Sequence, residues 1–360
     1  MVGARPNFVK LAPVVHALRD RPGVAVRILH SGQHYDPALS AAFIEQLGLP
    51  PPDENLSVGS GTHAEQTAGV LVGVERALLR DRPDAMIVAG DVNSTLAAAL
   101  AGVKLGIPIV HVEAGLRSGD WAMPEEINRV LTDRVADLLL CTSADAVGNL
   151  AIEGIAGERV VLAGNTMIDS LHRLVGHANT SELLASLGLE RRRLALVTLH
   201  RPAVVDDPER LAAVLAVLER LADQLPVVFP MHPRTRARLQ SIGPRRARKL
   251  VLLEPLSYLD FLALESAARL VITDSGGVQE ETSALGVPCL TYRTTTERPV
   301  TLELGTNRLV GTDPAALAAA CREELALARD FAPAAIPLWD GHAGERAAAA
   351  IAAMLARGAQ

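Results

Sequence analysis

The sequence predicts an α/β protein built from two Rossmann-like, doubly wound parallel-sheet domains that face each other across a cleft. The chain has 360 residues, of which 49% are hydrophobic and 21% charged, and this is enough to bury two cores of ordinary size. Short β-rich apolar runs recur along the chain, and amphipathic stretches with helical spacing separate most of them. This alternation is typical of parallel strands joined by crossover helices.

The apolar runs are the expected strands. They lie at residues 24–30, 85–88, 107–112, 138–142, 160–163, 194–199, 227–231, 250–253, 270–273 and 287–292. The stretch 207–224 has clear helical spacing. Because 164–190 has a weak strand signal, we expect an N-terminal domain over 1–165 and a C-terminal domain over 166–360. We also expect the last helix to pack back on the N-terminal domain.

The first strand of the N-terminal domain is short in this sequence. Only Met1 and Val2 precede the loop-like segment Gly3-Ala4-Arg5-Pro6. A first strand is usually central in this topology, and without it the neighbouring strands lack ladder partners. We therefore expect the natural chain to start several residues earlier.

Charge and composition exclude several classes of function. The formal net charge of −6 argues against a broad nucleic-acid surface. Cys141, Cys289 and Cys321 lie far apart with no metal-binding spacing, which indicates buried thiols in a reducing compartment. The sequence has no recognisable signal peptide and no apolar run long enough to cross a bilayer. We expect a cytoplasmic protein without a membrane or nucleic-acid partner.

The segment TDSGGVQEE, residues 273–281, has the features of an anion-binding turn. It follows an apolar run and precedes a helical pattern. Gly276 and Gly277 permit close backbone approach, and a helix that starts after Ser275 directs unpaired amides and its positive dipole end outward. Glu281 lies one helical turn beyond Gly277, within reach of a sugar hydroxyl next to a bound phosphate. Alone, the turn is equally consistent with a plain tight turn.

Other polar residues follow the expected strands of the N-terminal domain. Arg5 and Lys10, in GARPNFVKLAPV, surround the start of a helix, where cations are unfavourable unless an anion is bound. Gln33 and His34, in SGQHYD, follow another strand. Asp91, in VAGDVNSTLAAALA, precedes a helix and is either a cap or a functional carboxylate.

A dense group of ionisable residues follows the strand at 107–112. The segment HVEAGLRSGDWAMPEEINR contains His111, Glu113, Arg117, Glu125, Glu126 and Arg129. So many ionisable groups after one buried strand favour a functional role. In the C-terminal domain, His200 and His232 each close a strand, and their corresponding places on one sheet favour function over a structural role.

Together these segments resemble the non-hydrolysing UDP-N-acetylglucosamine 2-epimerases, a family in the GT-B glycosyltransferase-like group. The resemblance runs from Gly3 to about Asp313. It rests on the blocks GARPNFVKLAPV, SGQHYD, GDVNSTLAAALA, HVEAGLRS, MPEEINR, TLHR, DSGGVQEETSALGVPCLTYR and TTERP, in family order. It implies a GT-B-like fold, UDP bound mainly by the C-terminal domain, and reversible conversion of UDP-GlcNAc to UDP-ManNAc for cell-surface polysaccharide biosynthesis. It also implies a homodimer that needs no metal or other cofactor.

The resemblance further implies roles for single residues. The proton-transfer carboxylates would be Asp91, Glu113 and Glu125. The diphosphate would contact Arg5, Lys10, His200, Ser275, Gly276 and Gly277, with His200 also counted among the catalytic groups. Glu281 would bind the ribose. Further substrate contacts would come from Gln33, His34, Arg117, Arg129, His232 and Arg293.

The sequence departs from the family pattern in two places. After His200 it continues as Pro202-Ala203-Val204, where arginine, glutamate and asparagine are commoner. The segment SGTHAEQTAG lacks the arginine associated with allosteric binding of a second UDP-GlcNAc in some members. Activation by substrate would therefore have to proceed without that arginine.

The residues favour elimination over oxidation as the route to inversion at C2. Neither DSGG nor GARP resembles a dinucleotide fingerprint. Loss of UDP to a 2-acetamidoglucal needs cations on the departing diphosphate and carboxylates near C2, and the sequence supplies both. A hydrolysing epimerase, an epimerase of a modified UDP-HexNAc, a GT-B glycosyltransferase and a catalytically silent nucleotide-sugar sensor are the alternatives. In a glycosyltransferase the carboxylate-rich segment HVEAGLRSGDWAMPEEINR would have no evident role in sugar transfer.

Overall fold

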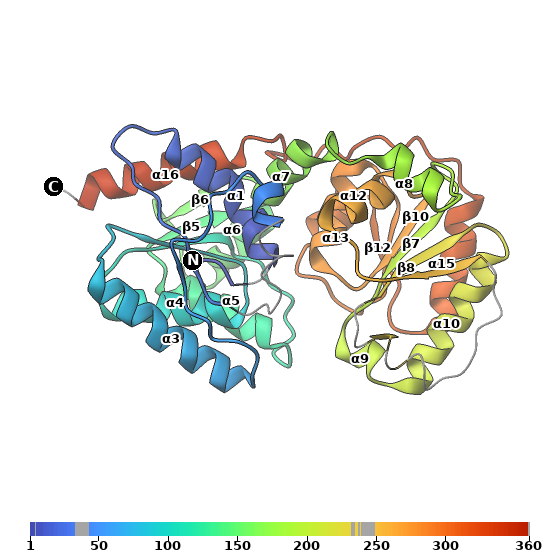
Figure 1. Cartoon of the computed structure of the whole chain (residues 1–360), viewed down its shortest axis with the longest axis horizontal. Helices are drawn as coiled ribbons and strands as arrows, with labels where there is room; N and C mark the ends of the chain where they lie inside the picture. The colour runs from blue at the N-terminus through green and yellow to red at the C-terminus, as the bar shows by residue number, and fades with distance from the viewer. Residues whose placement is uncertain (4, 33–42, 232–234, 237, 239–248, 359–360) are drawn as a thin grey trace. The chain divides into compact units, whose positions relative to one another are not determined.

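The chain forms two compact units, each built around a parallel sheet (Figure 1). The computed structural model describes residues 1–360 except 4, 33–42, 232–234, 237, 239–248 and 359–360. The first unit contains Met1–His172 and Pro337–Gln360, and the second contains Arg173–Ile336. The expected division at residue 165 precedes the observed one, which falls within helix α7 (Thr166–Val175). The predicted α/β class with parallel sheets in two domains is confirmed.

The first unit has a four-stranded and a two-stranded parallel sheet. Its strands are β1 (Leu29–His30), β2 (Glu54–Asn55), β3 (Met86–Ala89), β4 (Ile109–Ala114), β5 (Leu138–Cys141) and β6 (Val160–Leu162). The four-stranded sheet has the order β3-β4-β5-β6. Besides α7, the described helices are α1 (Arg5–Arg19), α3 (His63–Arg80), α4 (Asn93–Lys104), α5 (Pro124–Val135), α6 (Ala144–Ile152) and α16 (Ala343–Gly358). Helix α16, from the end of the chain, lies along α1 (Figure 1).

Val2 forms the link between these two sheets. Its amide donates to the carbonyl of Leu29 at 2.9 Å, and the amide of Ser31 donates to the carbonyl of Val2 at 2.9 Å. On the other side, the Met1 ammonium donates to the carbonyl of Ile87 in β3 at 2.8 Å. The predicted strand over 24–30 is too long, because its partners Val2 and β2 pair only with Leu29 and His30.

The second unit has one six-stranded parallel sheet. Its strands are β7 (Ala195–Thr198), β8 (Val227–Pro230), β9 (Leu250–Leu253), β10 (Leu270–Thr273), β11 (Cys289–Thr291) and β12 (Asn307–Leu309). Its described helices are α8 (Thr180–Ser186), α9 (Pro202–Val205), α10 (Pro208–Ala222), α12 (Tyr258–Ala267), α13 (Gly276–Leu285), α14 (Val300–Glu303) and α15 (Pro314–Ala326). The strand order is β12-β11-β10-β7-β8-β9. This is the order of a Rossmann dinucleotide-binding sheet, and it reverses between β7 and β10.

Both faces of the second sheet are covered, as the continuous apolar runs predicted. Along β10, Leu270 and Ile272 belong to the core cluster beneath α10, whereas Val271 belongs to the cluster beneath α12. Successive side chains of a strand point to opposite faces. A strand that is apolar at every position is therefore buried on both faces of the sheet. Crossover helices on the two faces provide this burial.

Local chemistry sets the ends of the helices that position the site. Asp207 caps α10 by accepting the amides of Glu209 at 3.0 Å and Arg210 at 3.2 Å. Helix α13 ends at Gly286, which has φ +67°. A side chain at Gly286 would also overlap the backbone of Ala332, so this cap requires glycine.

Two further sequence expectations concern location. In the described part of the chain, no helix is long and apolar enough to cross a membrane. The three cysteines are buried and free, as expected. Burial raises the pKa of each thiol to about 12, which makes all three poor nucleophiles.

Candidate active site

The ends of β7 and β10 lie side by side where the strand order of the second unit reverses. Open parallel sheets bind ligands at this position, beyond the carboxyl ends of their strands. Asp274 follows β10, and its carboxylate accepts the amides of His200 at 3.0 Å and Arg201 at 2.8 Å. The Nδ1 atom of His200 lies 2.8 Å from Asp274 Oδ1. Asp274 therefore ties the loop after β7 to the loop after β10 and orients the His200 ring.

Asp274 is a buried carboxylate beside a half-exposed imidazole. Its side chain is fully buried, whereas that of His200 is 54% exposed. Burial alone would raise the pKa of Asp274, but the hydrogen bonds from His200 and Arg201 outweigh burial and hold that pKa below its usual value. Asp274 thus stays charged at neutral pH, and His200 presents an oriented ring at the surface of the unit.

The predicted glycine turn starts helix α13 directly after this carboxylate. Ser275 is the N-cap residue, and its side chain makes no capping hydrogen bond to the helix. Ser275, Gly276 and Gly277 are half-buried. The first amides of a helix have no partner within the helix, and together with the helix dipole they favour an anion at this end. The turn therefore has the geometry of a phosphate site.

Gly276 is closely packed against two charged side chains. A side chain at this position would overlap Arg298 Nη1 and Glu297 Oε1. Arg298 also pairs with Glu280 at 3.0 Å, and Glu297 accepts a hydrogen bond of 2.7 Å from Arg293. All four charged residues are buried. The positive charge of Arg298 is thus held directly against the glycine turn.

Glu281 lies in an acidic and deeply buried setting. Tyr258 donates its hydroxyl to Glu281 Oε1 at 2.6 Å. Burial, with a smaller contribution from Glu280, raises the pKa of Glu281 to about 7, although the Tyr258 hydrogen bond opposes this rise. Glu265 is fully buried, and neither of its carboxyl oxygens has a hydrogen-bond partner among the described residues. Burial and the nearby Glu281 raise the pKa of Glu265 well above its usual value.

In the first unit, Lys10 and Glu113 form a buried ion pair beside Gly90. Lys10 comes from α1 and Glu113 from β4. The backbone of Glu113 has φ +68°, and the register of β4 against β5 shifts at this residue. Left-handed backbone at a non-glycine residue is costly, and such strain concentrates at functional sites. The bulge aims the Glu113 carboxylate toward Lys10.

Asp91 lies at the carboxyl end of the neighbouring strand β3 and pairs with the buried Arg129 of α5. Arg129 also pairs with Glu126. Glu126 in turn accepts the amides of Ser118 at 3.0 Å and Gly119 at 2.9 Å. Burial alone would raise the pKa of Glu126, but these amides and Arg129 hold it below its usual value.

Glu125, the adjacent residue in α5, has a different environment from Glu126. Its side chain is exposed, whereas Glu126 is buried. Of the three carboxylates predicted to transfer protons, Asp91 and Glu113 thus lie at the ends of adjacent strands and each pairs with a cation. Glu125 stands in the first turn of a helix.

His111 and Arg117 belong to a buried network around Asp133. His111 Nδ1 lies 2.6 Å from Asp133 Oδ1, and Arg117 donates to Asp133 Oδ2 at 2.7 Å. Arg117 also makes two hydrogen bonds to Glu153, of 2.6 and 2.9 Å. Burial would raise the pKa of Asp133, but His111 and Arg117 outweigh burial and lower it. Arg117, predicted to bind substrate, thus has its guanidinium engaged by two carboxylates of its own unit.

Several predicted residues fall outside the described part of the chain. These are Gln33, His34 and His232, together with the side chain of Arg5. Conversely, four residues without a role assigned from the sequence lie next to predicted site residues: Asp274, Glu126, Tyr258 and Glu265. Asp274 lies within the recognised TDSGG segment, so its position after a strand was an available signal. Among the described residues, no three His, Cys, Asp or Glu side chains form a cluster that could hold a metal ion.

Residues 16–352 match the family model described as UDP-N-acetylglucosamine 2-epimerase. The chain belongs to this family. It is 40% identical over 356 residues to the UDP-N-acetylglucosamine 2-epimerase of Methanocaldococcus jannaschii, and the alignment covers 96% of both chains. It is 41% identical over 314 residues to the UDP-2,3-diacetamido-2,3-dideoxy-D-glucuronate 2-epimerase of Pseudomonas aeruginosa, with 86% of this chain and 87% of the relative covered. The resemblance found in the sequence is confirmed.

Solved structures of the family share this fold. The M. jannaschii UDP-GlcNAc 2-epimerase in complex with UDP-GlcNAc and UDP is 39% identical, with a TM-score of 0.88 and coverage of 99% of this chain and 98% of that one. Staphylococcus aureus MnaA with UDP is 32% identical, with a TM-score of 0.90 and coverage of 99% and 95%. The predicted GT-B-like architecture is confirmed by these neighbours, which belong to the same epimerase family.

Proposed function

We propose that this protein reversibly inverts C2 of UDP-GlcNAc to give UDP-ManNAc. The observation that carries the proposal is the strand, glycine turn and helix start at the point where the Rossmann order of the second unit reverses, in a chain of the 2-epimerase family. In M. jannaschii, a family member is named UDP-GlcNAc 2-epimerase and was solved with UDP-GlcNAc and UDP.

The second unit would hold the UDP moiety. The amides of Gly276 and Gly277 suit the diphosphate, because they belong to the first turn at the positive end of α13. The amide of Ser275 donates to the Thr273 hydroxyl at 2.9 Å, so Ser275 would contact the diphosphate through its own hydroxyl. His200, oriented by Asp274, lies in the adjacent loop and would donate to a phosphate oxygen. Glu281 would accept hydroxyls of the ribose.

The first unit would carry out proton transfer at C2. A carboxylate removes the C2 proton as the bond from C1 to the diphosphate oxygen breaks, and UDP leaves with that electron pair. The C1=C2 double bond of a 2-acetamidoglucal forms, and delivery of a proton to the other face with return of UDP completes the inversion. Asp91, Glu113 and Glu125 are the groups we assign to these transfers, and the support is their placement after β3, after β4 and in α5.

The cations paired with two of these carboxylates suit such a role. Lys10 lies beside Glu113 and Arg129 beside Asp91, and a positioned cation stabilises negative charge in a reacting site. Glu126 has a different task in this scheme. Because it is already saturated by Ser118, Gly119 and Arg129, it would position Arg129 and the loop at 118–119 without contacting the sugar.

A second candidate substrate is a modified UDP-HexNAc. It is favoured by the 41% identity to the P. aeruginosa enzyme named for UDP-2,3-diacetamido-2,3-dideoxy-D-glucuronate, which is as high as the identity to the M. jannaschii enzyme. The same elimination would serve both sugars, because neither the 3-acetamido group nor the uronate takes part in bond breaking at C1 and C2. Assays with both substrates separate the two candidates by kcat/KM.

We further propose a cytoplasmic homodimer. Buried free thiols are consistent with a reducing compartment. Exposed apolar side chains gather on three neighbouring helices of the first unit: Val72 and Leu79 on α3, Val103 on α4, and Ile127 and Leu131 on α5. A continuous exposed apolar patch marks an interface, and we propose that these side chains belong to one.

Incubation with UDP-GlcNAc in heavy water tests the proposal directly. We expect NMR to show UDP-ManNAc with deuterium at C2, without added nicotinamide. Free ManNAc and UDP as the only products would indicate a hydrolysing enzyme. Retention of the original C2 hydrogen, or a requirement for NAD, would overturn the elimination route.

A further inference from the structure

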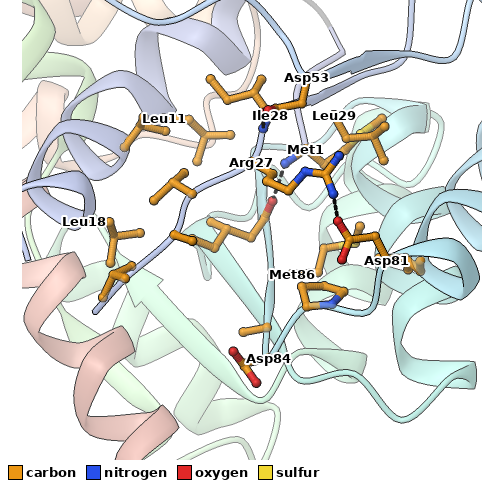
Figure 2. Close-up of a pocket in the computed structure, with 18 of the residues that line it drawn as sticks. Met1, Leu11, Leu18, Arg27, Ile28, Leu29, Asp53, Asp81, Asp84 and Met86 are labelled. Atoms are coloured by element: carbon orange, nitrogen blue, oxygen red, sulfur yellow. Dashed lines mark hydrogen bonds and ion pairs between the residues drawn. The ribbon is translucent and has the colours of Figure 1, made fainter. Parts of the chain in front are cut away.

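Strand β3 leads into the turn that carries Asp91, and it is incompletely packed at its start. It lies at the edge of the four-stranded sheet, where it pairs with β4. Met86, its first residue, lines a cavity of about 450 Å³ (Figure 2). A segment with few packed contacts is held weakly. The position of Asp91 therefore depends on contacts made at the turn itself.

Side chains from three different elements hold the backbone of this turn, residues 89–91. Each of the three successive carbonyl oxygens lies within hydrogen-bond distance of one side-chain nitrogen. The nitrogens are Nδ2 of Asn7 in α1 at 2.7 Å from the Ala89 carbonyl, Nε2 of His111 in β4 at 2.8 Å from the Gly90 carbonyl, and Nδ2 of Asn128 in α5 at 2.8 Å from the Asp91 carbonyl.

His111 is the one of these three residues that can carry a charge. Its side chain and that of Asp133 are both fully buried, and Nδ1 lies 2.6 Å from the Asp133 carboxylate. Arg117 and the amide of Gly115 donate to the other oxygen of Asp133, which favours its charged form. A carboxylate and a carbonyl only accept, and a neutral imidazole has a single donor. The ring of His111 thus satisfies both neighbours only as the imidazolium.

Stability alone gives little reason for a buried ion pair here. Taking two charges out of water costs about as much free energy as their attraction returns, so apolar side chains often serve a buried position equally well. The pair of His111 and Asp133 has a directional effect instead. Asp133 fixes the ring, and the ring in turn fixes the Gly90 carbonyl.

Gly90 connects this pair to the groups assigned to proton transfer. It has φ +65°, and its amide donates to the carbonyl of Val112 at 3.0 Å. A side chain at Gly90 would begin 2.9 Å from Lys10 Nζ and 3.2 Å from Glu113 Oε2, so the turn lies directly against that ion pair. A shift of the Gly90 carbonyl would move Asp91, the next residue, and would also disturb the contact with Lys10 and Glu113.

We propose that His111 is a positioning residue for proton transfer at C2. As a buried imidazolium it donates to the Gly90 carbonyl and thereby fixes Asp91 relative to Lys10 and Glu113. This role rests on the function proposed above, in which these carboxylates transfer protons. No part of the His111 side chain is exposed, so it acts through the turn and not on the substrate. Displacement of a reacting group by about 1 Å can lower a rate on the order of 100-fold.

Two amide variants separate the two donors of the ring. The amide nitrogen of Asn reaches about as far as Nδ1 of His, and that of Gln about as far as Nε2, so His111→Asn keeps a donor toward Asp133 and His111→Gln keeps one toward Gly90. His111→Gln leaves a charged oxygen of Asp133 without its donor, so it should lower Tm at least as much as His111→Asn. We nevertheless expect kcat to be at least about tenfold lower in His111→Asn than in His111→Gln, with little change in KM.

This opposite order of stability and activity is what a merely structural role would not give. A kcat of His111→Gln equal to or below that of His111→Asn, or an effect confined to KM, would overturn the positioning role. His342, which is 61% exposed, provides the control His342→Asn, and this variant should leave kcat and Tm unchanged.

Nitrogen-15 NMR of the imidazole rings gives a second readout that needs no activity. The ring whose signals disappear in His111→Gln should carry protons on both nitrogens at neutral pH, and a neutral tautomer of that ring would overturn the proposal. A parent chain that epimerises UDP-GlcNAc, with equal kcat in the two variants, would refute the positioning role alone. A parent without epimerase activity would refute the proposed function, and the NMR spectrum would still decide whether His111 holds the turn as an imidazolium.

Discussion

Tyr258 donates its hydroxyl to the buried carboxyl of Glu281 at 2.6 Å, at the residue we assign to the ribose. Two features of this pair are opposed: the hydrogen bond favours the charged carboxylate, and burial favours the neutral acid. Burial dominates, so the proton on Glu281 is released near neutral pH. Protonation of this residue is therefore linked to stability and, in the role we assign to it, to nucleotide binding.

The stability of the second unit should fall as pH rises from about 4.5 to about 7. The pKa of Glu281 is raised from 4.5 to about 7 in the folded chain, so over this interval the folded state holds a proton that the unfolded state has lost. Above pH 7 the Glu281 carboxylate is charged in both states, and the free energy of unfolding is lower than below pH 4.5 by on the order of a few kcal/mol. In urea denaturation, the free energy of unfolding of Glu281→Gln should fall less over this pH interval than that of the parent chain. The exposed Glu190 supplies the control Glu190→Gln, and an unchanged slope for Glu281→Gln would contradict the assignment.

Substitution of Gly277 should weaken UDP binding at least about tenfold, which corresponds to about 1.4 kcal/mol. A bulky side chain in the first turn of α13 would stand where we place the diphosphate. Calorimetric titration of Gly277→Val with UDP measures the effect, and its Tm shows whether the fold survives. Gly148, in α6 with open space around it, provides Gly148→Val as a matched control in another helix. Equal UDP affinity of the two variants would remove the glycine turn from the site.

At least one of Asp91→Asn, Glu113→Gln and Glu125→Gln should lower kcat by about 10²–10⁴-fold, the usual effect of losing a general acid or base. The amides keep the shape and remove the titratable proton. A variant that still eliminates but cannot reprotonate should release 2-acetamidoglucal and UDP, which NMR identifies. Glu158→Gln, at a position 86% exposed, should leave kcat unchanged. Full activity in all three amide variants would exclude these carboxylates.

Asp133→Asn should destabilise the first unit by roughly 3 kcal/mol, because it leaves buried partners of a charge network uncompensated. Asp133 accepts from His111, Arg117 and the amide of Gly115. The pKa of Asp133 is lowered in the fold, so its stabilising contribution is present at neutral pH and is lost as pH falls through that lowered value. Denaturation at pH 7 and pH 3 should therefore show a smaller difference between variant and parent at pH 3 than at pH 7.

If the apolar side chains of α3, α4 and α5 form the dimer interface, Leu79→Glu should give a monomer. Leu79 is 67% exposed, so the substitution should cost little within one chain. Analytical ultracentrifugation measures the mass, and Leu304→Glu in the second unit, at a position 51% exposed, is the control. A dimer that persists in Leu79→Glu would place the interface elsewhere.

The parts of the fold that could be predicted from sequence are those encoded by uninterrupted apolar runs. The runs at 138–142 and 270–273 became β5 and β10 because side chains on both faces of these strands are buried. Strand β2 was missed, since Glu54 and Asn55 carry no apolar pattern and pair only through their backbones. Short edge strands of this kind depend on their neighbours more than on their own side chains.

The candidate site was predictable in its loops but not in its orientation. Glu125 and Glu126 are adjacent in the sequence, and only the rotation of α5 decides that Glu126 faces inward and Glu125 outward. The same holds for Glu265. The sequence shows only a glutamate within the helical pattern of α12, and its burial depends on how α12 packs near Glu281. The spacing of residues along the chain shows which of them share one face of a helix. Tertiary contacts decide which face is turned toward the core.

The return of the last helix to the first unit sets the order in which the protein is completed during synthesis. The amide of Gly344 donates to Asp169 at 2.7 Å, and the indole of Trp339 donates to the carbonyl of Thr142 at 3.0 Å. Both contacts need residues that leave the ribosome after the whole second unit. The second unit is continuous in sequence and can close its sheet while translation proceeds. The first unit cannot be completed before then, so the surface of α1 that α16 covers stays exposed until Ala343–Gly358 emerges.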